Sequence, residues 1–313
     1  MNSLNTTSIL VSGGSSFVGK QLVKHLQKHT NSQIIVCSRS DLSLLSTHEN
    51  TVYEKVDLLD NDSYREVFLK HNPKIVFHLA AITRLSPGEN DPELTVRTNF
   101  FGTKIIADLC VEFKSNIFIS ISSNLARNPK SVVGLTKYFS EVYLRNKANQ
   151  TTKMLSIRLA NVLDSPGSVT PLFKKLIDNN KPITITHPEM ERRFIDKFEA
   201  SELITQMLTI ADNSNVYVVM KDNTRIVDLA KDMLNKFHKK LDIEFIGMKK
   251  GEKLIEEAYK ESEIIRTKVD ELAILKDCWS VDEINDNIIT LENKSNKEIF
   301  LGLMEKLKLN LQL

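Results

Sequence analysis

The stretch Ile9-Leu10-Val11-Ser12-Gly13-Gly14-Ser15-Ser16-Phe17-Val18-Gly19 decides the fold of this chain. An apolar run breaks into clustered glycine and serine and then resumes with helical spacing, which predicts a strand, a tight turn and a helix start. In that geometry, backbone N–H groups and a helix N-terminus can receive a diphosphate. A glycine-rich turn also fits an ordinary strand-to-helix loop, so its place in the chain matters. Here it heads an alternating pattern of strands and helices, which favours a nucleotide site.

Short apolar runs and amphipathic stretches alternate through the first half of the chain. Strands are expected at residues 33–37, 51–56, 74–79, 116–121 and 154–158, and helices at 18–26, 60–71, 92–113 and 131–149. Strands that alternate with helices form right-handed parallel crossovers. We therefore predict an α/β fold with a Rossmann-type doubly wound parallel sheet.

The pattern changes after Arg158, where prolines become frequent and the expected strands shorten. We expect residues 1–160 to form the Rossmann domain that binds the nucleotide, and residues 161–313 to form mainly a smaller substrate-binding part. Residues of about 195–240 are expected to return to the Rossmann core, with a strand at 216–220 and a helix at 226–237. The last part of the chain, rich in Lys, Glu and Asn, is weakly patterned.

The composition is that of an ordinary globular protein. Of the 313 residues, 41% are hydrophobic and 26% are charged, and the net charge is +2, which offers no basic field for nucleic acid or a membrane surface. Three widely spaced cysteines, Cys37, Cys110 and Cys278, fit a reducing compartment and show no metal-ligand spacing. The N-terminus is polar, and the sequence contains no apolar run long enough to cross a bilayer. We expect a cytoplasmic protein with no metal, no nucleic-acid partner and no membrane insertion.

Three later stretches carry a family resemblance. They are residues 158–163 followed by 167–173, residues 182–190 running into Arg192-Arg193-Phe194, and residues 243–247 followed by 251–257. In this order and spacing they resemble the extended short-chain dehydrogenase/reductases that modify nucleotide sugars. The likeness is to the polysaccharide-biosynthesis branch, which includes UDP-N-acetylglucosamine 4,6-dehydratases, and it covers residues of about 8–260. It implies a nicotinamide cofactor, a nucleotide-sugar substrate (a UDP-sugar is favoured), and a homo-oligomer.

The resemblance also implies which residues hold the cofactor. They come from the opening turn, the ends of the next strands and two helices: Ser12, Gly13, Ser16, Phe17, Val18, Gly19, Asp57, Leu58, Leu79, Ala80, Ala81, Asn99 and Lys137. Ser16 departs from the pattern, because the family usually has its middle glycine there. His78 is expected to be a satisfied residue at a strand end rather than a catalytic one.

The end of the second strand indicates which dinucleotide binds. An acidic residue there would bond the ribose 2′-hydroxyl, whereas arginine offers charge-assisted bonds to a 2′-phosphate. The sequence supplies Ser38 and Arg39, with no acid until Asp41. We therefore predict NADP rather than NAD, with the alternative that Arg39 is a plain surface charge.

The catalytic positions depart from the family. Its members use a Tyr four residues before a Lys as the base, and here Lys137 is present but Val133 stands in the Tyr position. In relatives without that Tyr, a Thr-Asp-Lys run supplies acid and base, and the matching residues are Ser123-Asn124-Leu125. Dehydration needs both an acid and a base, while oxidation or reduction at C4 exchanges one proton with the sugar oxygen.

We therefore expect an NADP-dependent oxidoreductase that acts at C4 of a UDP-(N-acetyl)hexosamine in surface polysaccharide biosynthesis, leaning towards a 4-keto reductase. Its catalytic candidates are Lys137, Ser122, Ser123 and Asn124. Glu141 lies one turn after Lys137 and would form an ordinary i,i+4 pair with it. Tyr143 and Lys147 repeat the Tyr–Lys spacing but lie beyond the mapped site.

Two other functions stay open. One is a nucleotide-sugar 4,6-dehydratase or epimerase with an atypical acid and base. The other is a catalytically impaired homologue that binds NADP and a nucleotide sugar. In each case the resemblance implies substrate contacts from Asn161, Val169, Arg193, Lys249 and Glu252, with Arg192 and Lys250 as solvated neighbours.

Overall fold

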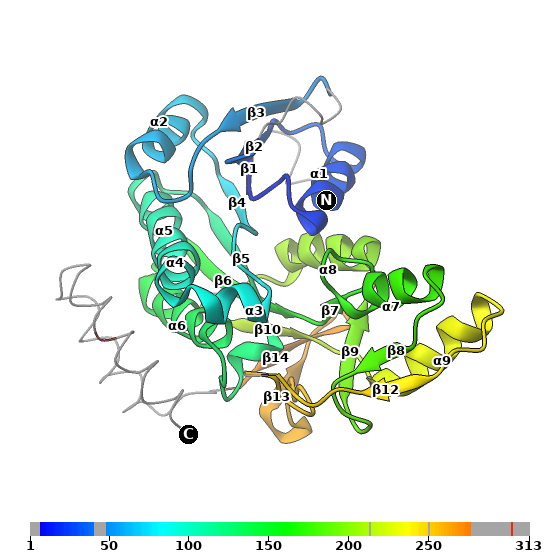
Figure 1. Cartoon of the computed structure of the whole chain (residues 1–313). Helices are drawn as coiled ribbons and strands as arrows, with labels where there is room; N and C mark the ends of the chain where they lie inside the picture. Colours follow the sequence, from blue (N-terminus) through cyan, green and yellow to red (C-terminus); the bar gives the residue numbers. More distant parts are fainter. Residues whose placement is uncertain (1–6, 41–47, 213, 250, 277–301, 303–313) are drawn as a thin grey trace.

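The alternating strands and helices build one large twisted sheet in the computed structural model, which describes residues 7–40, 48–212, 214–249, 251–276 and 302 (Figure 1). The strand order is β13-β14-β10-β6-β5-β4-β1-β2-β3. From β10 to β3 every pairing is parallel, and the order reverses beside β1, where ligands of doubly wound sheets bind. The predicted α/β Rossmann-type sheet is confirmed. The strands are β1 (Ile9–Ser12), β2 (Ile34–Ser38), β3 (Thr51–Lys55), β4 (Ile75–His78), β5 (Ile117–Ser123), β6 (Lys153–Leu159), β10 (Val216–Val219), β13 (Ile264–Arg266) and β14 (Leu272–Leu275).

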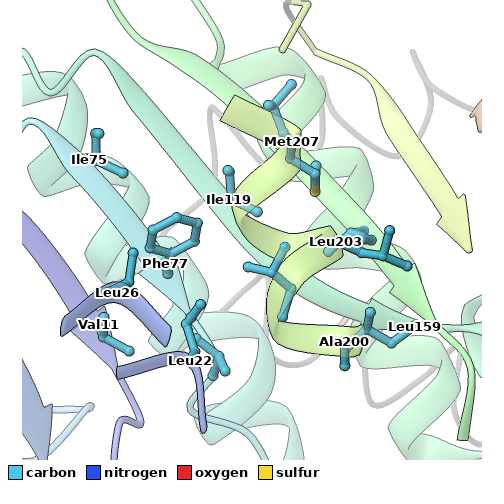
Figure 2. Packing of buried hydrophobic residues seen from close by; sticks show 14 of the residues in the cluster. Val11, Leu22, Leu26, Ile75, Phe77, Ile119, Leu159, Ala200, Leu203 and Met207 are labelled. Carbon is cyan, nitrogen blue, oxygen red and sulfur yellow. The ribbon is translucent and has the colours of Figure 1, made fainter. Parts of the chain in front are cut away.

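Helices cover both faces of this sheet because its strands are apolar on both sides. Leu10 of β1 packs with α2 (Asn61–His71), α5 (Gly102–Glu112) and α6 (Val132–Lys147). Its neighbours Ile9 and Val11 point to the opposite face and pack with α1 (Phe17–His29) and α8 (Lys197–Ile210). Figure 2 shows this second layer, in which Phe77 and Ile119 of the sheet lie against Leu22 and Leu203 of the two helices.

A smaller unit follows β6, on one side of the main sheet (Figure 1). It contains a three-stranded sheet of β7 (Asn161–Val162), β9 (Glu191–Ile195) and β11 (Asn223–Arg225), and a parallel pair of β8 (Ile183–Ile185) and β12 (Ile243–Phe245). Helices α7 (Val169–Asp178) and α9 (Ile226–Lys236) close a core of their own around Phe173 and Ile183. Between them the chain returns to the large layer, because α8 packs on α1 and β10 pairs with β6.

Two regions differ from the expectation. The helix expected at 92–113 is divided into α4 (Pro92–Val96), a π-helical stretch (Arg97–Phe101) and α5, and the widened turn carries the buried Asn99. Strands β13 and β14 extend the main sheet in the antiparallel sense. They are too short for their period to be read from sequence. The remaining elements are the helix α3 (Leu85–Asn90) and two 3-10 turns, η3 (Asn124–Ala126) and η4 (Glu261–Glu263).

Among the described residues, no helix is both long and apolar enough to cross a membrane.

Candidate functional site

The turn after β1 is held by close backbone contacts. The N–H groups of Gly13 and Gly14 donate to the Cys37 carbonyl at the end of β2, over 2.9 and 3.3 Å. Gly13 has a φ of +74°, and a Cβ atom there would lie 2.6 Å from the backbone N of Ala80. Glycine is therefore required both by the backbone conformation and by the approach of the loop after β4.

Ser16 fits the turn because it begins the helix. It is the N-cap of α1, and its Oγ accepts a hydrogen bond from the Gly19 N–H over 3.1 Å. Gly19 in turn lies against the Gly13 carbonyl, where a Cβ atom would come within 2.3 Å. Phe17 and Val18 then place their N–H groups in the first turn, where a helix leaves donors without intrahelical partners. The turn thus keeps its close backbone approach and its capped helix start although serine replaces the usual glycine.

The ends of β2 and β3 lie next to this turn. Ser38 is buried, its Oγ lies 2.5 Å from Ser15 Oγ, and it accepts the Ser40 N–H over 3.2 Å. Arg39 is exposed between them. Directly after β3, the Val56 N–H donates to the Ser38 carbonyl, and the exposed Asp57 carboxylate follows. Arg39 and Asp57 therefore stand at the same sheet edge as the glycine turn, whereas Asp41 lies outside the described residues.

Two further polar residues fasten the turn and the loop after β4. The buried His78 has its Nδ1 3.1 Å from Ser12 Oγ and its Nε2 3.1 Å from Thr103 Oγ1. Burial lowers the pKa of this imidazole to about 3, so it is neutral, and its expected role as a satisfied residue at a strand end is confirmed. Asn99 accepts the Ile82 N–H and donates to the Ile82 carbonyl, over 2.7 and 2.9 Å.

Asn99 also donates to Thr136 Oγ1 of α6, over 3.0 Å. It thus ties the loop that begins with Leu79, Ala80 and Ala81 to the helix that carries Lys137. Leu58, an expected cofactor contact in the loop after β3, packs its side chain against Gly102. Among the expected cofactor residues, the side chains of Asn99 and Leu58 therefore contact other parts of the protein. The glycine turn and Ala80 instead contact each other through backbone atoms.

Val133, which stands where the family has its Tyr, is covered by a helix of the same chain. Val133 is 1% exposed, and Gly88 of α3 lies directly on it, because a Cβ atom at Gly88 would come within 2.5 Å of Val133 Cγ2. Glu89, the next residue, accepts the Val132 N–H over 2.7 Å. Helix α3 therefore occupies the space above Val133, and a larger side chain there would displace it.

Lys137 lies one turn further along α6 and is buried. Its Nζ donates to the Ile121 carbonyl near the end of β5, over 2.7 Å. Burial lowers the pKa of this ammonium to about 8. Glu141 does not pair with Lys137 in the way the spacing suggested. It forms a buried ion pair with Arg158 of β6, because the carboxylate turns towards the sheet.

The three other catalytic candidates differ in what they offer. Ser122 donates its proton to Glu141 Oε1 over 2.5 Å, so that proton is already engaged. Ser123 is half-buried, and its Oγ accepts the Leu125 N–H over 3.3 Å. Asn124 is 1% exposed, and neither polar atom of its amide has a hydrogen-bond partner in the described part of the chain. A buried polar group without a partner is costly and marks a position where function can outweigh stability.

Tyr143 and Lys147 lie at the other end of α6. The Tyr143 hydroxyl donates to Asp108 Oδ1 over 2.5 Å, and Lys147 Nζ lies 2.9 Å from the same atom. This cluster joins α6 to α5 and is separate from the glycine turn.

Glu256 gathers several of the expected substrate residues. Asn161 donates to its carboxylate over 3.1 Å, and Arg193 donates to its carbonyl over 2.9 Å. Arg192 is buried and pairs with Glu256 Oε1 over 2.8 Å, so the expectation that it is a solvated neighbour is wrong. Arg192 lies on β9, the central strand of the three-stranded sheet, and its side chain is directed to Glu256. Glu256 belongs to the stretch 251–257 that carries the resemblance. The acidic pair Glu256-Glu257 and the basic pair Arg192-Arg193 were the sequence signal from which this contact could have been predicted.

The other expected substrate residues lie nearer to α6. Glu252 accepts the Lys249 N–H over 2.8 Å, and the exposed Lys249 keeps its ammonium group outward. Between them in the chain, Gly251 lies against Ser131, the N-cap of α6. Lys253 donates to the Arg127 carbonyl, just after η3. Val169 begins α7 at the edge of the smaller unit, and Lys250 lies outside the described residues.

Comparison with known proteins gives one family. Residues 9–276 match the family described as polysaccharide biosynthesis protein. The capsular polysaccharide biosynthesis protein CapD of Staphylococcus aureus is 34% identical over 277 residues, which cover 83% of this chain and 46% of CapD. The chain thus spans about half the length of that relative. A UDP-N-acetylglucosamine 4,6-dehydratase (inverting) of Campylobacter jejuni is 29% identical over 261 residues, covering 80% of this chain and 77% of the dehydratase.

Solved structures share the fold. The dTDP-glucose 4,6-dehydratase DesIV from Streptomyces venezuelae, solved with NAD and TYD bound, superposes with a TM-score of 0.72. The match covers 79% of this chain and 87% of DesIV at 16% sequence identity, which establishes a common fold.

Replacing Gly13 tests the close approach in the turn. Gly13→Ala should abolish dinucleotide binding and lower stability, because its Cβ atom would collide with the Ala80 backbone. Gly247→Ala is the matched control, since Gly247 also has a positive φ, of +85°, but open space around it. The control should lose about 1 kcal/mol of stability and keep its affinity. Urea unfolding and fluorescence titration measure both quantities, and equal losses of affinity would contradict the assignment.

The neutral state of His78 predicts how stability depends on pH. Because its pKa in the folded protein is about 3, the unfolded chain binds more protons below pH 6.5, and acidification favours unfolding. This imidazole should cost about 2 kcal/mol of unfolding free energy between pH 7 and pH 5. His78→Asn should remove that part of the pH dependence, whereas His238→Asn, at an exposed position, should keep it. Urea unfolding at the two pH values measures the difference.

Proposed function

Because this chain belongs to the polysaccharide biosynthesis protein family, we propose that it is a nicotinamide-dependent enzyme that modifies a nucleotide sugar. The glycine turn, the α1 N-terminus and the ends of β2 and β3 support a dinucleotide site at one sheet edge. Asn161, Arg193, Lys249 and Glu252 lie on segments of the smaller unit and beyond it, where a sugar nucleotide would be held. The named relatives act in capsule synthesis and on UDP-N-acetylglucosamine, which favours a UDP-(N-acetyl)hexosamine.

The reaction we propose is oxidation or reduction at C4 of the sugar, in the direction of a 4-keto reductase. The observation that carries it is the unpartnered amide of Asn124, which can donate an N–H to a sugar oxygen but cannot gain or lose a proton. Val133 and Leu125 likewise bear no exchangeable proton. The described residues at these three positions therefore suit stabilisation of one C4 oxygen better than the two proton transfers of a dehydration.

A bound nicotinamide would supply or accept the hydride. Asn124 and the hydroxyl of Ser123 would hydrogen-bond the C4 oxygen, and Ser123 would pass a proton between that oxygen and solvent, since it is half-buried. Lys137 would hold the nicotinamide ribose, and its charge would stabilise negative charge developing nearby. Polarisation without a tuned base is expected to lower the rate about 10²–10⁴-fold against a full acid–base pair.

The cofactor we propose is NADP, although DesIV was solved with NAD. The support is Arg39, which is exposed at the end of β2, one residue beyond the Ser38 that packs against the turn. An arginine at this position can form charge-assisted hydrogen bonds with a 2′-phosphate.

Arg39→Ser tests this assignment. The affinity for NADP should fall about 10- to 100-fold, which corresponds to the loss of one charge-assisted interaction, while the affinity for NAD stays the same. Arg225→Ser removes an exposed arginine at the start of α9 and should change neither. Fluorescence titration with both dinucleotides measures the effect. Equal binding of NADP and NAD by the unaltered protein would contradict the proposal.

Product analysis tests the reaction. With NADPH and UDP-4-keto sugars, the protein should form the C4 alcohol, and with UDP-N-acetylglucosamine and NADP it should form no 4-keto-6-deoxy product. Asn124→Leu should lower kcat about 100-fold, because the donor to the C4 oxygen is lost. Asn146→Leu, at an exposed position on α6, is the matched control and should keep full activity.

Two outcomes would favour the alternatives. A 4-keto-6-deoxy product or an epimer would indicate a dehydratase or epimerase with an atypical acid and base. Binding of dinucleotide and sugar nucleotide without turnover would indicate the impaired homologue, which the filled space above Val133 favours among the alternatives.

A further inference from the structure

Lys137 is an ammonium group in the interior of the protein, where loss of hydration disfavours its charged form. Its side chain is buried, and this burial lowers the pKa of the ammonium to about 8. The charge of Glu141 acts in the opposite direction and raises that pKa. The charge on Lys137 near neutral pH therefore depends on its neighbour one turn away.

Glu141 acts on Lys137 without bonding it. Its Oε1 accepts hydrogen bonds from Ser122 Oγ and Arg158 Nε, over 2.5 and 2.9 Å, and its Oε2 accepts one from Arg158 Nη2 over 2.6 Å. The side chains of Glu141 and Arg158 are each 1% exposed. A carboxylate held by three donors in the interior has a fixed position. Its effect on Lys137 is exerted through the electrostatic field.

The register of the sheet places this pair under the candidate site. Ser122 lies opposite Arg158 in the pairing of β5 with β6, so one carboxylate of α6 joins the ends of both strands. The backbone carbonyl of the preceding residue, Ile121, accepts a hydrogen bond from the Lys137 ammonium group. Helix α6 is therefore fastened to β5 at two consecutive residues, and Ser123 and Asn124 follow directly.

We propose that the buried Glu141–Arg158 pair positions Lys137 and sets the electrostatic field at its ammonium group. Neither member of the pair reaches substrate or cofactor, so both are positioning residues. The consequence for catalysis rests on the proposed function, but the charge on Lys137 is measurable without turnover.

The other charged groups around α6 are neutral, bonded or exposed, except Lys253, which donates to the Arg127 carbonyl and interacts electrostatically with Arg158. His78 of β4 stays neutral above a pKa of about 3. Glu89 of α3 bonds the Val132 N–H, and Asp108 of α5 pairs with Lys104 and Lys147 at the far end of the helix. Arg97, in the π-helical stretch, is exposed. The Glu141–Arg158 pair is thus the buried charge pair through which Lys137 can be adjusted.

Single substitutions of Glu141 and Arg158 separate an electrostatic role from a structural one, because an electrostatic role changes the Lys137 pKa in opposite directions. Glu141→Gln leaves the Arg158 cation behind, so the Lys137 pKa should fall by about one pH unit, a tenfold change in the proton equilibrium. Arg158→Gln leaves the Glu141 carboxylate, so the same pKa should rise. NMR titration of protein labelled at lysine 13Cε measures it, with the signal assigned by its loss in Lys137→Met.

Shifts of the same sign, or none, would overturn the proposal. The double variant Glu141→Gln/Arg158→Gln should have a higher Lys137 pKa than the single variant Glu141→Gln. This comparison gives the sign of the effect of Arg158 even if Arg158→Gln alone does not fold. Asp108→Asn is the matched control, because it breaks an ion pair at the far end of α6 and should leave the Lys137 pKa unchanged. If the unaltered protein binds its ligands but shows no turnover, the proposed function fails while the titration still decides this inference.

Discussion

The structure depends on the contact between the turn after β1 and the two strand ends beside it. Gly13 lies on the Ala80 backbone and donates to Cys37, so three parallel strands meet with almost no side-chain volume between them. This approach brings the α1 N-terminus, the β2 end and the β4 loop to one edge of the sheet. Every other feature of the candidate site is placed relative to that edge, because parallel strands present their carboxyl ends together.

Buried polar groups then hold the helices that surround this edge. Asn99 joins the β4 loop to α6, His78 joins β4 to α5, and the Glu141–Arg158 pair joins α6 to the sheet. A second buried pair, Arg192 with Glu256, plays the same part between β9 and the later segment. Such pairs contribute little net stability, because desolvation offsets their attraction, but breaking one is costly. Removing one partner of either pair would therefore weaken the contact between the elements it joins.

The departures from the family pattern are accommodated in different ways. Ser16 is compatible with the turn because its hydroxyl caps the helix. Val133 is compatible because Gly88 of α3 packs on it, so the fold has closed over the position instead of leaving a gap. Asn124 has no such compensation, since its amide is buried without a partner among the described residues. The changes at Ser16 and Val133 are thus compensated by contacts within the described protein, and the change at Asn124 is not.

The order of strands and helices and the glycine turn were readable from sequence, because each depends on local periodicity and on residues with special backbone freedom. The short strands β13 and β14 and the π-helical stretch were not, since a few residues show no period. The sequence predicted which positions belong to the candidate site, but it did not predict which residue each side chain contacts. Glu141 stands four residues from Lys137 yet pairs with Arg158, and Arg192 turns inward to Glu256. The sequence by itself determined the main alternating strands and helices and where the glycine turn lies. Only the tertiary structure decided which charges meet, because that depends on the register of distant strands and the face each helix buries.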